Sequence, residues 1–327
     1  MGRVGPFSLT PRTVGILAAV ITVAIWTSFI VIARAAALRN MTPFDIAYAR
    51  IIGASVILLP WGWWLVRKEK LQGWLGVSPL PLRMTALAGT FGGLGYALLA
   101  YAGFVFAPAT HASVLLPGSL PLWTTLVAIW LLHDKPSRAR AIGLGCILVG
   151  DLLVGGSSLL HAFDGGEVWK GDLLFVCGAL CWSVYSVLVR RHALPAVKAT
   201  IAITCFAAVI YLPIYTALLL LGMAGSHLSA TPWSEFVFNL LFQGVGSVAI
   251  SGITFTKMVQ HFGPVRSTMI TALVPGLSAL GAVMFLGEPM HWNLLAGLAL
   301  VTLGITFAVR SNAKPVAPST PAAKISP

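Results

Sequence analysis

Polar side chains recur at helical spacing inside an otherwise apolar stretch near residue 250. Residues three and four apart share one face of an α-helix. This stretch places four polar residues on such a face: Gln243, Ser247, Ser251 and Thr254. Amides and hydroxyls donate and accept hydrogen bonds, so the pattern suits the lining of a substrate-binding cavity. Hydroxyls that only join neighbouring helices are the alternative interpretation.

Aromatic and further hydroxyl-bearing residues occupy other apolar stretches. The candidates for the same cavity are Trp26, Tyr96, Trp182, Tyr185 and Thr271. Pro121 and Pro275 each fall near the middle of an apolar stretch, where a proline removes a backbone hydrogen bond and kinks the helix. The freed carbonyl needs a partner in protein or in a wet cavity, so both prolines join the candidate lining. The set indicates a mixed aromatic and hydroxyl cavity for a small amphipathic metabolite.

Two ionisable residues inside apolar stretches are separate candidates for a charge or coupling site. Arg50 has three interpretations: its side chain extends to the membrane surface, it pairs with Asp45, or it holds an anionic substrate. Asp151 lies near the centre of its stretch, where an aspartate costs about 3 kcal/mol on insertion scales. Asp151 is therefore a candidate proton site.

His133 and Asp134 form the only dyad that hints at enzymatic chemistry. Neither a nucleophile with its base, nor a metal-ligand cluster, nor a glycine-rich phosphate loop accompanies them in the sequence. We therefore expect a protein that is not an enzyme and that needs no metal and no cofactor. An intramembrane lipid-modifying enzyme and a non-transporting membrane subunit are kept as alternatives.

The composition places these residues in a polytopic membrane protein. Only 9% of the 327 residues are charged and 57% are hydrophobic, whereas a soluble domain carries about 25% charged residues. A bilayer core of about 30 Å needs about 20 helical residues per crossing, and ten such stretches fit. The predicted fold is all-α, with ten transmembrane helices at residues 13–33, 43–65, 84–106, 111–132, 139–160, 171–189, 200–222, 236–256, 267–286 and 292–309.

The basic residues predict the orientation of these spans. The net charge of +12 gathers in short segments between spans, which is typical of a topology signal and not of a nucleic-acid surface. Only Arg34, Arg39 and Lys170 would lie opposite the N-terminus, so both termini are predicted to be cytoplasmic. Residues 1–12 and the proline-rich residues 311–327, which we expect to be disordered, are then cytoplasmic tails.

An internal repeat divides the chain into two halves. Four landmarks recur at a constant offset of 154: Pro121, Asp134, Gly143 and Gly150 match Pro275, Glu288, Gly297 and Gly304. The repeats cover residues 13–160 and 171–310, with a linker at 161–170. Each holds five spans, an odd number, so the two copies enter the membrane from opposite sides, as in transporters built from inverted repeats.

This pattern resembles the EamA-type transporters of the drug/metabolite transporter superfamily. Trp26 and Trp182 match the tryptophan in the first helix of each repeat, and Arg50 resembles the arginine usual in the second helix. The resemblance implies a secondary carrier in the bacterial cytoplasmic (inner) membrane, which exports a small organic metabolite, an amino-acid-like solute or a drug. It also implies alternating access through a central cavity without a bound cofactor.

Several features depart from that family pattern or stay open. His133–Asp134 replaces the Gly–Glu seen at Gly287–Glu288, and Pro117 and Asp151 are unusual. The resemblance places the fifth helix of each repeat at the periphery, so a function for Asp151 stays open. The expected partners are a small-molecule substrate and the lipid bilayer, with no nucleic acid, and a homodimer is compatible with the sequence.

Overall fold

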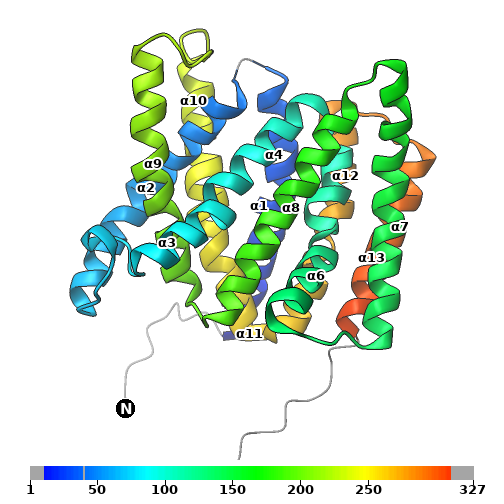
Figure 1. The fold of residues 1–327 in the computed structure, drawn as a ribbon, viewed down its shortest axis with the longest axis horizontal. Helices are drawn as coiled ribbons and strands as arrows, with labels where there is room; N and C mark the ends of the chain where they lie inside the picture. Colours follow the sequence, from blue (N-terminus) through cyan, green and yellow to red (C-terminus); the bar gives the residue numbers. More distant parts are fainter. Residues whose placement is uncertain (1–10, 40, 311–327) are drawn as a thin grey trace, which may run out of the picture.

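Long apolar helices lie side by side and make up nearly all of the described chain (Figure 1). The computed structural model describes residues 11–39 and 41–310, so the predicted tails fall almost wholly outside it. No β-strand occurs among these described residues. Eight of their helices are long and apolar enough to cross a membrane, and two shorter apolar helices follow at Val274–Leu286 and Trp292–Ala308.

The elements form two successive sets along the chain, before and after residues 165–167. The first set is α1 (Pro11–Ala37), α2 (Pro43–Lys68), η1 (Trp74–Gly76), α3 (Leu82–Gly89), η2 (Thr90–Leu94), α4 (Gly95–Phe106), α5 (Ala109–Ser113), η3 (Val114–Gly118), α6 (Leu120–Leu132), α7 (Arg138–His161) and η4 (Ala162–Asp164). The second set is α8 (Val168–Arg191), α9 (Ala196–Leu220), α10 (Trp233–Asn239), η5 (Leu240–Ile250), α11 (Ser251–Thr271), α12 (Val274–Leu286) and α13 (Trp292–Arg310).

A local sequence signal marks the start of α2, whereas the end of α11 differs from the prediction. At the start of α2, the Thr42 hydroxyl accepts a hydrogen bond from the Asp45 amide, and the Asp45 carboxylate accepts one from the Thr42 amide. The sequence predicts that the eighth span ends at residue 256 and that the ninth begins at residue 267, yet α11 continues through this region to Thr271. A proline within a helix kinks it without necessarily ending it, which lets Pro264 lie inside α11.

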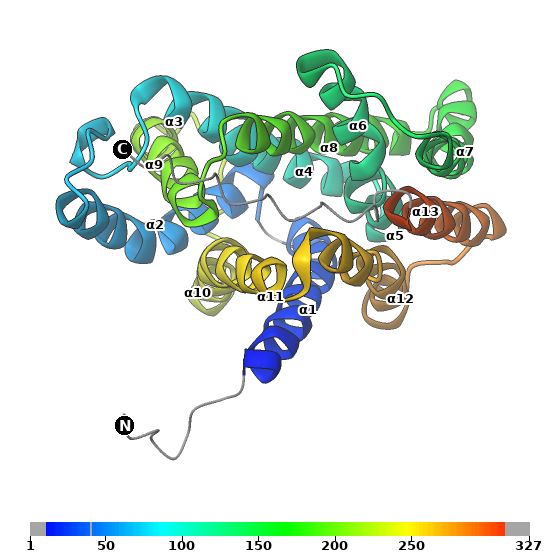
Figure 2. The ribbon, with the colours of Figure 1, turned by 90° about the horizontal axis from the view of Figure 1, so that it is seen from below.

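Glycines bring α7 and α13 into close contact at one edge of the molecule (Figures 1 and 2). A Cβ atom added at Gly143 would lie 2.6 Å from the Gly304 carbonyl oxygen, and one added at Gly150 would lie 2.7 Å from that of Gly297. Because Gly143 faces Gly304 while Gly150 faces Gly297, the two helices run antiparallel. The first landmark glycine of each repeat therefore packs against the second landmark glycine of the other repeat.

Three of the helical rods contain π-helical turns near the centre of the molecule. These are η2 and η5, which join α-helical turns directly, and η3, which is separated from α6 by a bend at Ser119. The unusual Pro117 lies inside η3, where an α-helical hydrogen bond could not form. Wider turns of this kind change the direction in which the following side chains point, and they occur often at functional sites.

Candidate functional site

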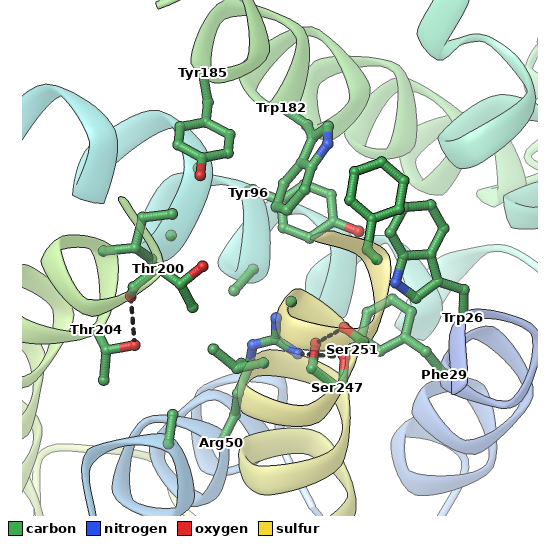
Figure 3. Close-up of a pocket in the computed structure, with 18 of the residues that line it drawn as sticks. Trp26, Phe29, Arg50, Tyr96, Trp182, Tyr185, Thr200, Thr204, Ser247 and Ser251 are labelled. Atoms are coloured by element: carbon green, nitrogen blue, oxygen red, sulfur yellow. Dashed lines mark hydrogen bonds between the residues drawn. The ribbon is translucent and has the colours of Figure 1, made fainter. Parts of the chain in front are cut away.

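A cavity of about 450 Å³ lies between the two halves of the chain (Figure 3). Its walls come from α1, α2, η2, α4, η3 and α6 of the first half and from α8, α9, η5, α11 and the start of α12 in the second. Apolar surface dominates, with a small number of polar groups among aromatic rings, as is usual for small-molecule sites. The labelled lining residues are Trp26, Phe29, Arg50, Tyr96, Trp182, Tyr185, Thr200, Thr204, Ser247 and Ser251.

Aromatic rings from both repeats form one side of this cavity. The ring centroids of Tyr96 and Trp182 are 4.9 Å apart, and those of Trp182 and Tyr185 are 5.3 Å apart. Gly92 in η2 makes room for this cluster, since a Cβ there would lie 2.4 Å from the Tyr185 ring. Trp26 on α1 contributes the matching tryptophan of the other repeat. Such faces suit an apolar or aromatic ligand body.

Arg50 is the cation of the cavity wall. Its guanidinium lies 3.1 Å from the Ser247 hydroxyl and 3.4 Å from the Tyr101 hydroxyl, and 5.6 Å from the centroid of the Phe29 ring. No carboxylate among the described residues forms an ion pair with it. Its guanidinium is therefore held by neutral acceptors beside open cavity space, as Figure 3 shows.

The pairing of Arg50 with Asp45 does not form. The Asp45 carboxylate is fully buried and accepts hydrogen bonds from Ser226 at 2.5 Å, from Tyr215 at 2.8 Å and from the His227 amide at 3.1 Å. Five positions along a helix correspond to a rotation of about 140°, so the two side chains leave α2 in different directions. Asp45 instead fixes the loop after α9 to the start of α2.

Backbone contact between α2 and η5 places Arg50 beside the polar stripe, which consists of Gln243, Ser247, Ser251 and Thr254. A Cβ at Gly53 would lie 2.1 Å from the Leu240 carbonyl oxygen, and one at Gly244 would lie 2.7 Å from the Arg50 carbonyl oxygen. The two glycines therefore let the helices touch. The Arg50 guanidinium also lies 3.3 Å from the Gln243 carbonyl oxygen, which makes η5 its main support.

The four residues of the polar stripe have different surroundings. Ser247 and Ser251 line the cavity. Gln243 lies outside the lining, fully buried, and its side-chain oxygen accepts a hydrogen bond from Tyr101 at 3.2 Å. Thr254 also lies outside, where it is bonded to Thr22 on α1 at 2.8 Å. The π-helical turns of η5 end at Ile250, and α-helical turns follow. Residues before and after Ile250 therefore do not lie on one face at α-helical spacing.

The two prolines of the repeat and Thr271 also lie outside the cavity lining. Pro121 is the second residue of α6 and Pro275 is the second residue of α12. A proline in the first turn sacrifices no intrahelical bond, so the kinks that we expected in mid-helix are replaced by helix starts. Thr271 is the last residue of α11, just before the second of these starts.

Asp151 and the His133–Asp134 dyad lie away from the cavity. One carboxylate oxygen of Asp151, Oδ1, is buried without a hydrogen-bond partner among the described residues, and Asp151 is not in the lining. His133 ends α6 in the left-handed conformation, with a φ of 56°, as Gly287 ends α12 with a φ of 67°. The Asp134 carboxylate accepts a hydrogen bond from Arg190 at 2.6 Å. The dyad thus serves a helix end and an ion pair.

Several lining residues were absent from the sequence-based set. Phe29 follows Trp26 at a spacing of three, and Thr200 and Thr204 on α9 are spaced by four, so helical periodicity from known neighbours could have indicated them. Phe255 stacks on Trp26 with ring centroids 5.3 Å apart and also lines the cavity. It carries no polar signal, and only the packing of α11 against α1 identifies it.

The two ends of the molecule differ in packing. At one end Glu288 accepts hydrogen bonds from the Ala109 and Thr110 amides, both at 2.9 Å, and lies 3.4 Å from the guanidinium of Arg34. His111 lies 2.9 Å from Asp172 at the same end, with both side chains largely buried. At the other end, the lining of the cavity extends to the last turn of α8 and the first residue of α9.

Comparisons with known proteins agree with these observations. The model of the EamA-like transporter family matches residues 13–156 and 169–310. An uncharacterized transporter from Archaeoglobus fulgidus is 25% identical over 285 residues, which cover 86% of this chain and 92% of that protein. The uncharacterized transporter YyaM of Bacillus subtilis is 22% identical over 238 residues, covering 71% and 76% of the two chains.

More distant similarities support the same conclusion. The WAT1-related protein At5g40210 of Arabidopsis thaliana is 23% identical, with 86% of this chain and 83% of that protein covered. A solved crystal structure has a similar fold, with a TM-score of 0.57 at 20% identity over 90% of this chain and 96% of the other. Both repeats match one family whose relatives are named transporters, in line with the expected absence of enzymatic function. The chain is therefore a multi-pass membrane transporter that belongs to the EamA-like transporter family.

Proposed function

We propose that this protein is a secondary transporter of small amphipathic organic acids, which bind in the central cavity with their carboxylate on Arg50. The observation that carries the proposal is an arginine without an acidic partner in an aromatic cavity. A cation in such surroundings is costly without an opposite charge, and a bound anion supplies that charge. An arginine also matches a carboxylate with two parallel hydrogen bonds.

The remaining walls favour a ligand with an apolar body. The tryptophan and tyrosine rings offer flat apolar surface, and the Ser251 and Thr200 hydroxyls lie among them. An ammonium group, as in an amino-acid-like solute, could make a cation–π contact with the ring of Trp26 or Trp182. A volume of about 450 Å³ lies within the range of small-molecule sites.

The proposed mechanism is alternating access between two inverted five-helix repeats. We take α12 and α13 as the ninth and tenth crossings, although they are shorter than the other eight. The antiparallel contact between α7 and α13, the last helices of the two repeats, supports the inversion. The two repeats would then move relative to each other and expose the cavity to one side of the membrane at a time.

The charge distribution supports an inner-membrane location with both termini in the cytoplasm. In this orientation the last turn of α8 faces the cytoplasm, and the cavity lining reaches that side through Val189 and Ala196. The end with Arg34 and Glu288 is closed toward the outside. The conformation is thus inward-facing, and in the proposed outward transport this is the state that would load substrate from the cytoplasm.

Reconstituted vesicles test this proposal with two matched substitutions. Arg50→Gln removes the proposed anchor, while Arg67→Gln removes an exposed cation from the same helix that stacks on Trp63. Hydrogen bonds to charged groups contribute about 1.5–3 kcal/mol, so Arg50→Gln should lower the flux of aromatic carboxylates about tenfold or more. Arg67→Gln should leave it unchanged.

Solute pairs that differ in one group make the test specific. Wild-type protein should transport an aromatic carboxylate and discriminate against the matching neutral amide, and Arg50→Gln should abolish that discrimination. Equal flux of acid and amide through the wild-type protein would exclude an anion-binding role for Arg50. Flux of cationic solutes alone, unaffected by Arg50→Gln, would exclude the proposed substrate class.

A further inference from the structure

A second and larger cavity lies on the opposite side of α1 from the central one. Its volume is about 1350 Å³, above the range usual for small-molecule sites. Its walls come from α1, α10 and α12, and α11 contributes Phe262 and Ile270. Figure 2 shows α1 between α10 and α12. We call this cavity the α1 groove.

The α1 groove is distinct from the proposed transport site. Trp26 and Phe29 on α1 line the central cavity, whereas the adjacent Thr27 and Ser28 line the groove. Between the two, α1 is joined to α11 by the hydrogen bond of Thr22 to Thr254 and by the stacking of Trp26 on Phe255. A ligand of the groove therefore does not share the central site.

Most of the groove has the character of an acyl-chain site. Its apolar side chains include several that are half exposed or more, among them Val20, Leu273 and Leu280. Along α1 the lining runs from Ile16 to Ala36, a rise of about 30 Å at 1.5 Å per residue. This distance exceeds half of the roughly 30 Å hydrocarbon core, so a lipid chain of one leaflet can lie along it.

One end of the groove is polar, and its polar atoms lack partners. Asn239 is 1% exposed, and its amide nitrogen donates to the Glu235 carbonyl oxygen at 3.0 Å and to the Met41 sulfur at 3.4 Å. The side-chain oxygen Oδ1 of Asn239 and the carboxylate oxygen Oε1 of Glu235 are both buried without a hydrogen-bond partner among the described residues. Arg39 lies in the lining at the same end as an exposed cation.

We propose that the α1 groove binds a phospholipid whose headgroup carries a primary amine. The phosphate lies at Arg39, the ammonium donates hydrogen bonds to the unpartnered oxygens of Glu235 and Asn239, and an acyl chain follows α1 and α12. Buried acceptors are costly unless a donor reaches them, and a primary ammonium supplies three. A choline headgroup has no N–H donor and leaves both oxygens unpartnered. The anionic headgroup of phosphatidylglycerol lacks the positive charge that Glu235 favours.

Native mass spectrometry of the full-length protein tests this site. The protein is exposed in detergent to equimolar phosphatidylethanolamine, phosphatidylcholine and phosphatidylglycerol, and the lipids that remain bound are counted. We expect the wild-type protein to retain phosphatidylethanolamine about fivefold or more over phosphatidylcholine, since a charged hydrogen bond contributes over 1 kcal/mol. Equal retention of the three lipids would overturn the proposal.

Two groove variants and one control locate the binding. Glu235→Gln should lower the retention of phosphatidylethanolamine about fivefold, to the level of phosphatidylcholine, and leave phosphatidylcholine unchanged. Glu167→Gln neutralises another carboxylate on the same side, paired with Lys170 outside the groove, and should have no effect. Leu277→Trp fills the apolar part of the groove and should lower the retention of every lipid.

The fold of each variant is checked by its melting temperature before the lipids are counted. Lipid retention that survives Leu277→Trp would place the lipids elsewhere on the protein. Dimers that crosslink through cysteines at Val20 and Leu277 would instead show that a second copy of the chain covers the groove. Either result contradicts a phospholipid in this site.

Discussion

The two repeats place a matching ion pair at opposite ends of the molecule, but only one of the two is buried. Arg34 and Arg190 each follow the tryptophan of their repeat by eight residues, and Glu288 and Asp134 are also repeat equivalents. The side chains of Arg34 and Glu288 are 14% and 9% exposed, whereas those of Arg190 and Asp134 are 60% and 30% exposed. The two equivalent ion pairs therefore differ in burial within one conformation of the protein.

The packing around each pair explains the difference. The Arg34 guanidinium donates to the Phe104 carbonyl oxygen, and the rings of Phe104 and Phe175 pack at a centroid distance of 5.0 Å nearby. Glu288 also holds two backbone amides at the start of α5. The pair of Arg190 and Asp134 is more exposed, and the cavity lining reaches the same end at Val189 and Ala196. Under the proposed mechanism, the two ends exchange these environments during transport.

The largest contrast should come from removing the acidic member of each pair. Glu288→Ala leaves Arg34 without its carboxylate and two amides without an acceptor, so the free energy of unfolding should fall by about 3 kcal/mol or more. Asp134→Ala removes an exposed pair and should cost less than about 1 kcal/mol. Unfolding in mixed micelles measures both, and equal losses would contradict the assignment of one buried and one exposed pair.

A smaller contrast concerns the two faces of α7. Gly143→Ala should lower the free energy of unfolding by about 1–3 kcal/mol, because the added carbon would meet the Gly304 carbonyl oxygen on α13. Gly145→Ala meets nothing within 4 Å and should raise stability slightly, by about 0.5–1 kcal/mol. Similar responses at both positions would show that α7 and α13 do not pack along their glycines.

The smallest contrast concerns the ends of α6 and α12. His133 adopts the left-handed conformation that Gly287 adopts in the second repeat, and a side chain there costs about 1–2 kcal/mol. His133→Gly should therefore stabilise the protein by about 1 kcal/mol, and Gly287→Ala should destabilise it by a similar amount. A loss of stability in His133→Gly would mean that the histidine side chain makes a contact that outweighs the strain.

Much of the architecture could be predicted from the sequence because its signals are local or periodic. Long apolar stretches gave the helices, and glycines at a constant offset marked the helices that now pack as α7 and α13. The tryptophans Trp26 and Trp182 could be found as repeat equivalents, and both line the cavity. The predicted ten crossings are supported only in part, since α12 and α13 are short.

The detail of the cavity could not be predicted because it depends on helix irregularity and on partners from distant segments. The α-helical spacing from Gln243 to Thr254 ignores the π-helical turns of η5. Tyr215 and Ser226, which donate hydrogen bonds to the Asp45 carboxylate, lie more than 160 residues away in the sequence, so no local pattern shows that they occupy this carboxylate. From the sequence, Pro121 and Pro275 could each kink a long helix or begin a new one. Only the structure of the preceding turns shows that each lies at a helix start.

Cysteine labelling with substrate protection tests the central claim most directly. Thr200→Cys or Ser251→Cys is introduced into a variant without the native cysteines, and a membrane-impermeant maleimide is applied from each side of oriented vesicles. We predict labelling from the cytoplasmic side, slowed by a transported aromatic carboxylate when Arg50 is present and not slowed in Arg50→Gln. Inert cysteines, or protection that is the same with and without Arg50, would contradict a central cavity that holds its substrate through this arginine.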